Sequence, residues 1–163
     1  MKVFITGSTR AFGFELAKSF ANHGYDIVLN GRGKLTFKTT WDYCEYDHRK
    51  ITRWVFEQYQ PNIIVNNAFD KADCLESLKG QVNVLQQAVE YFDMMNGGII
   101  VNINSSKGLV ADVDFPEYAA AKHGLRGYSE SVKFEAYKRG VHILDLYPGA
   151  INVGMSAQRD DLD

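Results

Sequence analysis

Several residue types that mark specialised proteins are scarce in this chain of 163 residues. It has two cysteines, Cys44 and Cys74, too few for the disulfide framework of a small secreted protein, and it lacks the Cys/His spacing of a zinc site. We therefore expect free thiols and no metal. No apolar run approaches the roughly 20 residues of a membrane-spanning helix, and no signal peptide precedes the first apolar segment. These absences predict a cytoplasmic protein without a membrane partner.

The chain also lacks an excess of charge of either sign. Its formal net charge is −2, from 18 Lys and Arg against 20 Asp and Glu. Proteins that bind nucleic acids usually carry clustered basic residues, so this balance argues against a nucleic-acid partner. Apolar residues make up 45% of the chain and charged residues 23%, as in an ordinary globular protein. The length fits one domain, which we place at residues 1–163.

Short apolar segments alternate with longer segments of helical periodicity from the first residues onward. The expected strands are 3–5, 27–29, 41–46, 63–65, 99–103 and 141–147. The expected helices are 12–22, 51–59, 81–94 and 118–138. Strands joined by crossovers of this length pair in parallel through right-handed connections. The sequence therefore predicts an α/β fold with a doubly wound, Rossmann-type parallel sheet of about six strands and helices on both faces.

A glycine-containing turn, residues 6–13, links the first expected strand to the first expected helix. Gly7 allows a sharp turn and a close approach by phosphate. The helix start beyond it offers unpaired N–H groups and the positive end of the helix dipole. Plain loops also contain glycine, but a position directly after the first strand favours a dinucleotide site. The cofactor contacts expected from this turn are Gly7, Ser8, Thr9, Arg10, Phe12 and Gly13.

The end of the second strand bears on which nicotinamide cofactor is bound. NAD sites usually place an acid there to hold the ribose 2′-hydroxyl, whereas this strand ends in Asn30 and is followed by Arg32, with no carboxylate. Arg32 and Arg10 could instead hold a 2′-phosphate, which guanidinium groups bind well. Both could equally be solvated surface arginines. We expect NADP rather than NAD, with Asn30 and Arg32 beside it.

Tyr118 and Lys122 lie four residues apart on an expected helix and so share one face. A free tyrosine has a pKa near 10, too high for efficient proton transfer at neutral pH. A nearby ammonium favours the phenolate and lowers that pKa. Such a pair is often only part of an amphipathic helix. Ser105 favours the catalytic interpretation, because it follows the fifth expected strand, and ligands in these sheets bind at the carboxyl ends of strands.

At this point the sequence resembles the short-chain dehydrogenase/reductase family, from Lys2 to about Val153. The glycine turn is similar to that of the family, with Ala11 where the family often has glycine. The family's Asn-Asn-Ala-Gly resembles residues 66–69, with Phe69 in place of the last glycine. Residues 100–103 resemble the strand before the family's catalytic serine, and residues 148–149 its Pro-Gly pair.

The resemblance implies a role for each matching residue. Ser105, chosen over Ser106 by its spacing to Gly108, would polarise a substrate carbonyl. Tyr118 would give or accept the proton, and Lys122 would lower its pKa and hold the nicotinamide ribose. Asn83 would complete the catalytic tetrad by helping to carry a water that relays protons from Lys122. Asp47 would contact the adenine of the cofactor. The further cofactor contacts that the resemblance implies are Asn67, Ala68, Tyr118, Lys122, Pro148, Gly149 and Ile151.

The chain departs from the family beyond Pro148-Gly149. Family members continue through a helical segment that covers the substrate, and this sequence stops 14 residues later. The family's threonine near the carboxamide corresponds to Val153, which cannot donate that hydrogen bond. We expect an open site for a large substrate, or a cover supplied by another subunit. The two long helices, 81–94 and 118–138, would pair in a homodimer or homotetramer.

Three functions fit these residues. The first is an NADP-dependent carbonyl reductase or alcohol dehydrogenase for a small-molecule ketone or hydroxyl, such as a 3-oxoacyl thioester. The second is a non-catalytic NADP-binding sensor or scaffold, which the missing cover favours and the full catalytic set disfavours. The third is an epimerase or lyase on a similar fold, a class that usually carries a larger C-terminal domain.

Overall fold

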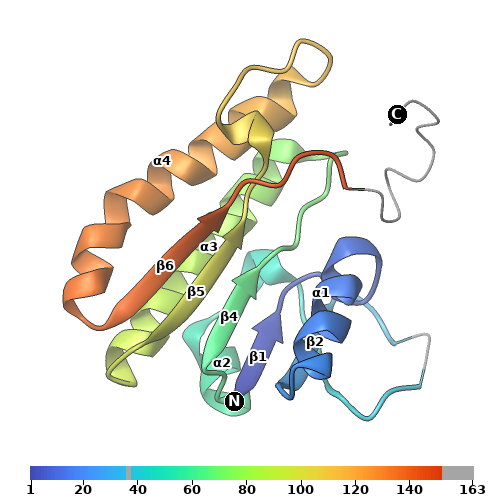
Figure 1. Cartoon of the computed structure of the whole chain (residues 1–163), viewed down its shortest axis with the longest axis vertical. Coiled ribbons are helices and arrows are strands. Elements are labelled where there is room, and N and C mark those ends of the chain that lie inside the picture. Colours follow the sequence, from blue (N-terminus) through green and yellow to red (C-terminus); the bar gives the residue numbers. More distant parts are fainter. Residues whose placement is uncertain (36–37, 152–163) are drawn as a thin grey trace.

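The computed structural model describes residues 1–35 and 38–151. Six strands form one sheet in the order β3-β2-β1-β4-β5-β6 (Figure 1). Their bounds are β1 Lys2–Ile5, β2 Asp26–Gly31, β3 Asp42–Glu45, β4 Ile63–Asn66, β5 Gly98–Ile103 and β6 Val141–Leu146. Every pair of neighbouring strands is parallel. The predicted doubly wound sheet is confirmed. Residues 152–163, which include Val153 and in which we expect no substrate-covering helical segment, lie outside the described residues.

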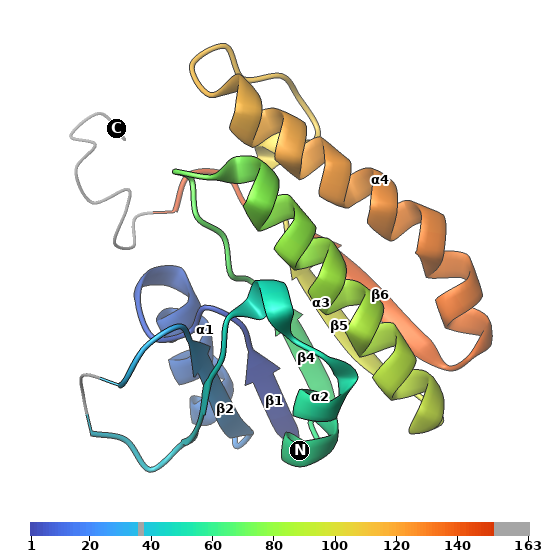
Figure 2. The same ribbon diagram turned by 180° about the vertical axis from the view of Figure 1, so that it is seen from behind.

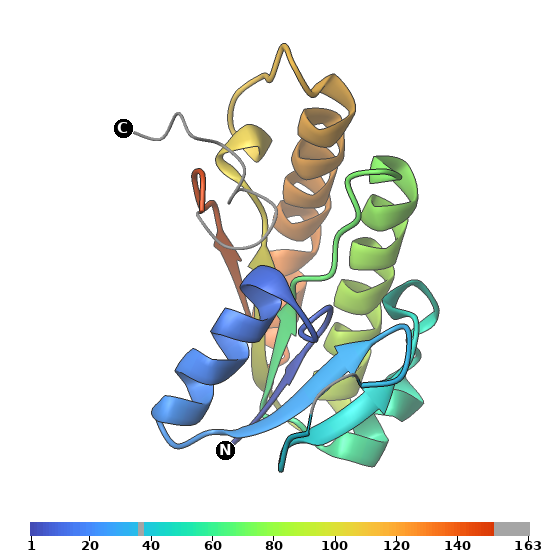
Figure 3. The same ribbon diagram turned by 90° about the vertical axis from the view of Figure 1, so that its right-hand side faces the viewer.

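Helices lie between most consecutive strands in the described part of the chain. They are α1 Ala11–Asn22, α2 Arg53–Tyr59, α3 Cys74–Met94 and α4 Pro116–Lys138, with short 3-10 helices η1 His48–Lys50 and η2 Ser106–Gly108. One face of the sheet carries α1, and the other carries α2, α3 and α4 (Figure 3). The third helix begins seven residues before the predicted start, because the Asp73 carboxylate caps it by accepting a hydrogen bond from the Glu76 N–H at 3.2 Å.

The central strands are buried on both faces, which is why they read as continuous apolar runs. Alternate residues of β1 point to opposite sides, as the side-chain period of two requires. Phe4 packs in the core below α2, α3 and α4. Val3 and Ile5 pack in the core below α1. These two layers hold the sheet rigid beneath the loops at its carboxyl edge.

Strand β6 forms one edge of the sheet and is buried on one face only. Val141 and Ile143 belong to the core beneath α3 and α4. Leu144 and Leu146 point the other way and are 51% and 48% exposed. Within the described ranges, α1 covers the β1–β2 end of that face and no helix covers β6 (Figure 1).

The long helices α3 and α4 lie side by side on one face of the sheet (Figure 2). Their inner sides pack on the core, and Phe134 and Tyr137 of α4 are exposed. Pairing of two copies through these helices stays a prediction. Among the helices that the structure describes, none combines the length and apolar character needed to cross a bilayer.

Candidate active site

The predicted motifs meet at the carboxyl edge of the sheet. The glycine turn follows β1, Asn67 and Ala68 follow β4, and Ser105 follows β5. Because β1, β4 and β5 are neighbours and parallel, their loops leave the sheet side by side (Figure 1). The order of the strands reverses between β1 and β4, which is the place where ligands bind in such sheets.

The glycine turn packs closely against the loop after β4. Gly7 has φ +63°, and a Cβ there would lie 2.8 Å from the Cα of Ala68. The Asn67 side chain joins the two loops by donating from Nδ2 to the Thr6 carbonyl at 2.9 Å. Helix α1 follows exposed Arg10, its N-cap residue, which makes no side-chain cap hydrogen bond, and the first turn of the helix holds no acid. Its first N–H groups therefore fit an anion such as a pyrophosphate.

Two predicted cofactor contacts, Ser8 and Asn30, have side chains that make hydrogen bonds within the protein at this turn. The Ser8 hydroxyl is fully buried, donates to the Ile5 carbonyl at 2.7 Å and accepts from the Asn30 N–H at 2.9 Å. The Asn30 side chain is also buried and donates to the carbonyls of Cys44 and Tyr46 at 3.1 and 2.9 Å. Both side chains are thus committed within the protein. These hydrogen bonds shape the loops of the candidate cofactor site, and the contact of Ser8 and Asn30 with the cofactor stays a prediction.

The two charged residues predicted near the adenosine half already have partners. Arg32 Nη2 lies 3.5 Å from Asp70 Oδ2, with both side chains exposed. Asp47 caps η1 and pairs with Arg49 at 2.6 Å. The hydrogen bonds from Arg49 lower the pKa of Asp47 to about 2. A ligand at Arg32 would compete with Asp70, a carboxylate that sequence reasoning did not consider.

The remaining predicted cofactor contacts border the same edge without forming a cluster. Thr9 and Phe12 are half-buried, and Gly13 and Ala68 are buried. The Pro148 carbonyl accepts from the Ser106 N–H at 2.9 Å, which ties the end of β6 to η2. Gly149 is exposed and Ile151 is half-buried.

Ser105, Tyr118 and Lys122 come together beside the end of β5. Ser105 is buried and caps η2 by accepting a hydrogen bond from the Lys107 N–H at 3.2 Å, and its hydroxyl lies close enough to Tyr118 to lower the pKa of that phenol. Tyr118 lies in the first turn of α4, which begins at Pro116, and Lys122 follows one turn later on the same face. This grouping joins a hydroxyl donor, a phenol and an amine.

Lys122 is buried among the described residues, with 2% of its surface exposed. Its Nζ donates to the carbonyl of Ile103 at 3.1 Å and to Oε1 of Gln81 at 3.3 Å. The ring of Phe69 covers it, with the centroid 4.2 Å from Nζ. Burial lowers the pKa of Lys122 to about 7. The amine can therefore gain or lose its proton near neutral pH.

The expectation that Lys122 lowers the pKa of Tyr118 is not met. Burial raises the pKa of Tyr118 above its ordinary value, and the hydrogen bond with Ser105 offsets part of that rise. The Lys122 ammonium lies 5.8 Å from the Tyr118 ring centroid. Both groups are removed from water, and burial disfavours the charged form of each. Tyr118 is therefore a protonated phenol at neutral pH.

The role of the fourth member of the predicted set, Asn83, stays a prediction. Asn83 Nδ2 donates to the Ile51 carbonyl at 2.7 Å, away from Lys122. Gln81, two residues earlier on α3, faces Lys122 instead. Two residues on a helix differ in direction by about 200°, so the two side chains cannot serve the same site. The choice of Asn83 rested on residue type. The helical period places Gln81 on the same side of α3 as buried Ala88, and this signal could have identified Gln81 as the residue that faces Lys122.

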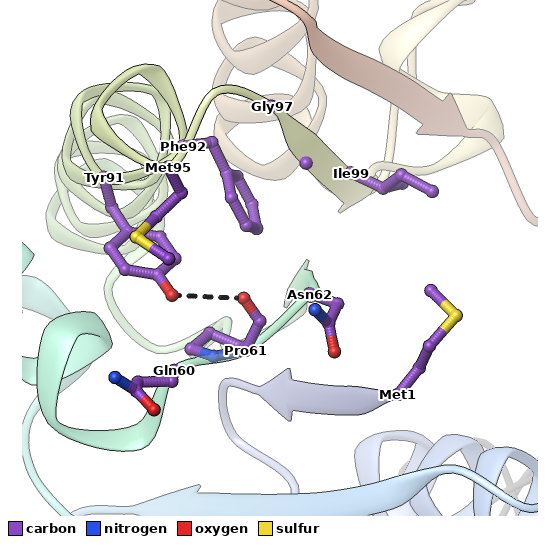
Figure 4. A pocket seen from close by; sticks show the side chains of 10 residues that line it. Met1, Gln60, Pro61, Asn62, Tyr91, Phe92, Met95, Gly97 and Ile99 are labelled. Carbon is purple, nitrogen blue, oxygen red and sulfur yellow. Dashed lines mark hydrogen bonds between the residues drawn. The ribbon is translucent and has the colours of Figure 1, made fainter.

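A separate pocket of about 300 Å³ opens at the opposite edge of the sheet (Figure 4). It lies among Met1, Asn62 and Gly98, at the beginnings of β1, β4 and β5, and Tyr91 Oη donates to the Pro61 carbonyl beside it. It holds none of the predicted site residues. Within residues 1–35 and 38–151, no group of three His, Cys, Asp or Glu side chains is placed to hold a metal.

Known proteins resemble this chain in sequence and in fold. A family model described as short chain dehydrogenase matches residues 73–162. The chain is 25% identical to a 3-oxoacyl-(acyl-carrier-protein) reductase of Chlamydia muridarum, over 96% of this chain and 76% of the relative. It is 26% identical to a D-beta-hydroxybutyrate dehydrogenase of Rhizobium meliloti, over 90% and 70%.

Solved structures share the fold at lower identity. A short chain dehydrogenase from Burkholderia cenocepacia, solved in complex with NADP, superposes with a TM-score of 0.85 at 20% identity, over 99% of this chain and 76% of that one. A gluconate 5-dehydrogenase from the same organism, in complex with NADP and tartrate, gives a TM-score of 0.84 at 24% identity, over 99% and 76%.

Proposed function

This chain belongs to the short-chain dehydrogenase family, and from that premise we propose that it is an NADP-dependent carbonyl reductase or alcohol dehydrogenase. The observation that carries the proposal is the placement of buried Ser105, at the end of β5, beside Tyr118, one helical turn from buried Lys122. A hydroxyl and a protonated phenol that converge on one point can both donate to a carbonyl oxygen.

NADPH, when bound, supplies the hydride for reduction. The residues that would hold its pyrophosphate are Gly7 and the first N–H groups of α1, a close-packed turn that fits such a group. Arg32 and Arg10 would take the 2′-phosphate, and Asn67 and Ala68 would border the ribose. The absence of a carboxylate at the end of β2 favours NADP over NAD. The relatives from Burkholderia cenocepacia described above bind NADP.

The protein's own groups divide the rest of the reaction. Ser105 would hold the carbonyl oxygen, and Tyr118 would deliver the proton to it. The raised pKa of Tyr118 keeps the phenol protonated at neutral pH, which is the form that reduction requires. Lys122, with a pKa of about 7, would return a proton to Tyr118 and hold the ribose. Phe69 has to turn aside before a ribose hydroxyl reaches Nζ, because its ring covers the ammonium.

The substrate class that we favour is a 3-oxoacyl thioester. The loop between η2 and α4 exposes Val110, Val113 and Phe115, with Val113 93% exposed. This apolar rim leads to Tyr118 and suits an acyl chain. The relative in Chlamydia muridarum is a 3-oxoacyl reductase, which agrees with this choice.

The second candidate function is a non-catalytic NADP-binding protein. Two observations favour it: the Phe69 ring covers Lys122, and Arg32 is paired with Asp70. In such a protein the cofactor would bind without a substrate, and Tyr118 would have only a structural role.

Turnover and binding together separate the two candidates. We expect the wild type to oxidise NADPH with an acetoacetyl thioester, and Tyr118→Phe to lose about 100-fold or more of that rate while its Kd for NADPH stays the same. Tyr128→Phe is the matched control, since Tyr128 is a half-buried tyrosine of the same helix packed on the core. Full activity in Tyr118→Phe would refute the proton-donor role. NADPH binding with no turnover of ketoacyl thioesters, sugars or simple ketones would favour the sensor.

A further inference from the structure

Gln81 is the one side-chain amide in contact with Lys122 within the described residues. It lies on α3, fully buried, and its Oε1 accepts from Lys122 Nζ at 3.3 Å. The Ile103 carbonyl accepts a second ammonium proton at 3.1 Å. The Phe69 ring covers Nζ from a third direction. The direction in which Lys122 points thus depends on two oxygens, and Gln81 provides the only one that a substitution can remove.

The orientation of the Gln81 amide is set by Asn66, at the end of β4. Gln81 Nε2 donates to the Asn66 carbonyl at 3.5 Å, and Asn66 Nδ2 donates to the Gln81 carbonyl at 2.8 Å. A side-chain amide that donates on one side presents its oxygen on the other. Its Oε1 is therefore directed at Lys122, and α3 is tied to the sheet at that residue.

The contacts continue through a row of buried polar side chains to the surface. Asn66 Nδ2 also donates to Asn102 Oδ1 at 3.0 Å. Asn102 Nδ2 donates to Asp145 Oδ1 at 3.0 Å, and Ser129 Oγ donates to Asp145 Oδ2 at 2.9 Å. Lys133 completes the row with an ion pair to Asp145 at 3.3 Å. Buried polar rows of this kind hold their members in one arrangement when the groups are paired. In this row Asn66 Oδ1 lacks a hydrogen-bond partner among the described residues, while Asn66 Nδ2 makes two hydrogen bonds.

We propose that Gln81 is the positioning residue for Lys122, held in place by the row of Asn66, Asn102 and Asp145. This inference rests on the proposed function, in which Lys122 serves Tyr118 and the cofactor. A neutral acceptor orients the ammonium and still lets it release a proton. A carboxylate at the same place would instead keep the proton on the amine.

The charged and titratable groups around Lys122 are compatible with Gln81 as its positioning residue. Tyr118 is on the same helix, and Lys71 and Cys74 are on the segment before and at the start of α3. Burial is the main cause of the low pKa of Lys122; Cys74 opposes it and Lys71 adds to it. No carboxylate is among these causes.

The test is the pKa of Lys122 measured by NMR of the full chain with ¹³Cε-labelled lysine, with the resonance assigned by its loss in Lys122→Arg. In Gln81→Met, which keeps the volume and removes the acceptor, we expect the pKa of Lys122 to fall by about one pH unit, since a hydrogen bond to a charged group contributes about 1.5–3 kcal/mol. In Gln81→Glu we expect it to rise. Gln86→Met, the same change at an exposed position of α3, is the control.

Opposite shifts in the two Gln81 variants, with none in Gln86→Met, would establish the inference. No shift in either variant, or shifts in the same direction, would overturn it. The readout needs no turnover, so it is independent of the proposed function. If the chain is a reductase, the pH–kcat profiles of the two Gln81 variants should move in the same directions as the pKa of Lys122, with KM little changed. If the chain is inactive but the pKa of Lys122 shifts, the proposed reductase function is wrong and Gln81 is still the positioning residue.

Discussion

The ring of Phe69 lies over the ammonium of Lys122, with 4.2 Å between the ring centroid and Nζ. The same ring meets that of Tyr118 edge to face, with 5.3 Å between the centroids. Phe69, which the family resemblance marks as a departure from glycine, therefore contacts both Lys122 and Tyr118. Any ligand group that reaches Lys122 has to displace it.

Removing the Phe69 ring should tighten cofactor binding. A cation–π contact contributes about 0.5–2 kcal/mol depending on its desolvation, and a protein that must open first binds more weakly in proportion. We expect Phe69→Ala to lower the Kd for NADPH by about tenfold, measured by fluorescence titration. Phe134→Ala is the matched control, since Phe134 also lies over a lysine ammonium, 4.4 Å from Lys138 Nζ, but is exposed. Equal or weaker binding by Phe69→Ala would show that the ring does not block the cofactor.

The Arg32–Asp70 pair should set the preference for NADPH. Arg32→Ala should raise KM for NADPH by about tenfold, because a charge-assisted bond to the 2′-phosphate is lost, and leave KM for NADH unchanged. Asp70→Asn should act in the opposite direction by up to about fivefold, since an exposed ion pair contributes at most about 1 kcal/mol. The amide retains Oδ1, which accepts from the Ala72 N–H at 3.1 Å. A change of both KM values by the same factor would exclude a phosphate at Arg32.

Burial of Lys122 should make the protein more stable as pH rises from 7 to 8.5. The unfolded chain keeps this lysine protonated up to its ordinary pKa, whereas the folded chain releases the proton near pH 7. The unfolded state then binds more protons, so the free energy of unfolding increases with pH, by about 2 kcal/mol over this interval. Above it, buried Cys44 and Cys74, whose pKa values burial raises, act in the opposite direction.

Urea unfolding at the two pH values measures this gain. Lys122→Met should lose it, because no amine remains to titrate, and Lys138→Met, at the exposed end of α4, should keep it. An equal rise in Lys122→Met and the wild type would assign the gain to other groups.

The sheet was predictable because its central strands are buried on both faces. Val3, Phe4 and Ile5 form a continuous apolar run, and the helical segments between such runs are long enough for parallel crossovers. The grouping of Ser105, Tyr118 and Lys122 followed from spacing and from the end of one strand. These inferences depend on local pattern and on topology, which the sequence carries directly.

The side-chain partners of several predicted site residues lie far away in the chain. Asn30 was expected at the cofactor, but its amide is used by two carbonyls of the loop after β3. Asn83 has the residue type of the family's asparagine and faces Ile51. The pKa of Tyr118 was expected to fall from the charge of Lys122, and burial of both groups outweighs that attraction. Depth of burial and the partner of each amide come from tertiary packing, and no local pattern specifies them.

The sheet order divides the chain into two consecutive halves of three strands each, which carry different parts of the candidate site. Residues 2–45 form β1, β2 and β3 with the glycine turn, and residues 63–146 form β4, β5 and β6 with the reactive side chains. Within the sheet the halves meet where Val3, Phe4 and Ile5 pair with Ile63, Ile64 and Val65. The link between them passes through exposed Gln60. A division of the chain at that residue would leave three consecutive strands and the nucleotide turn on one piece, and three consecutive strands and the proposed proton donor on the other.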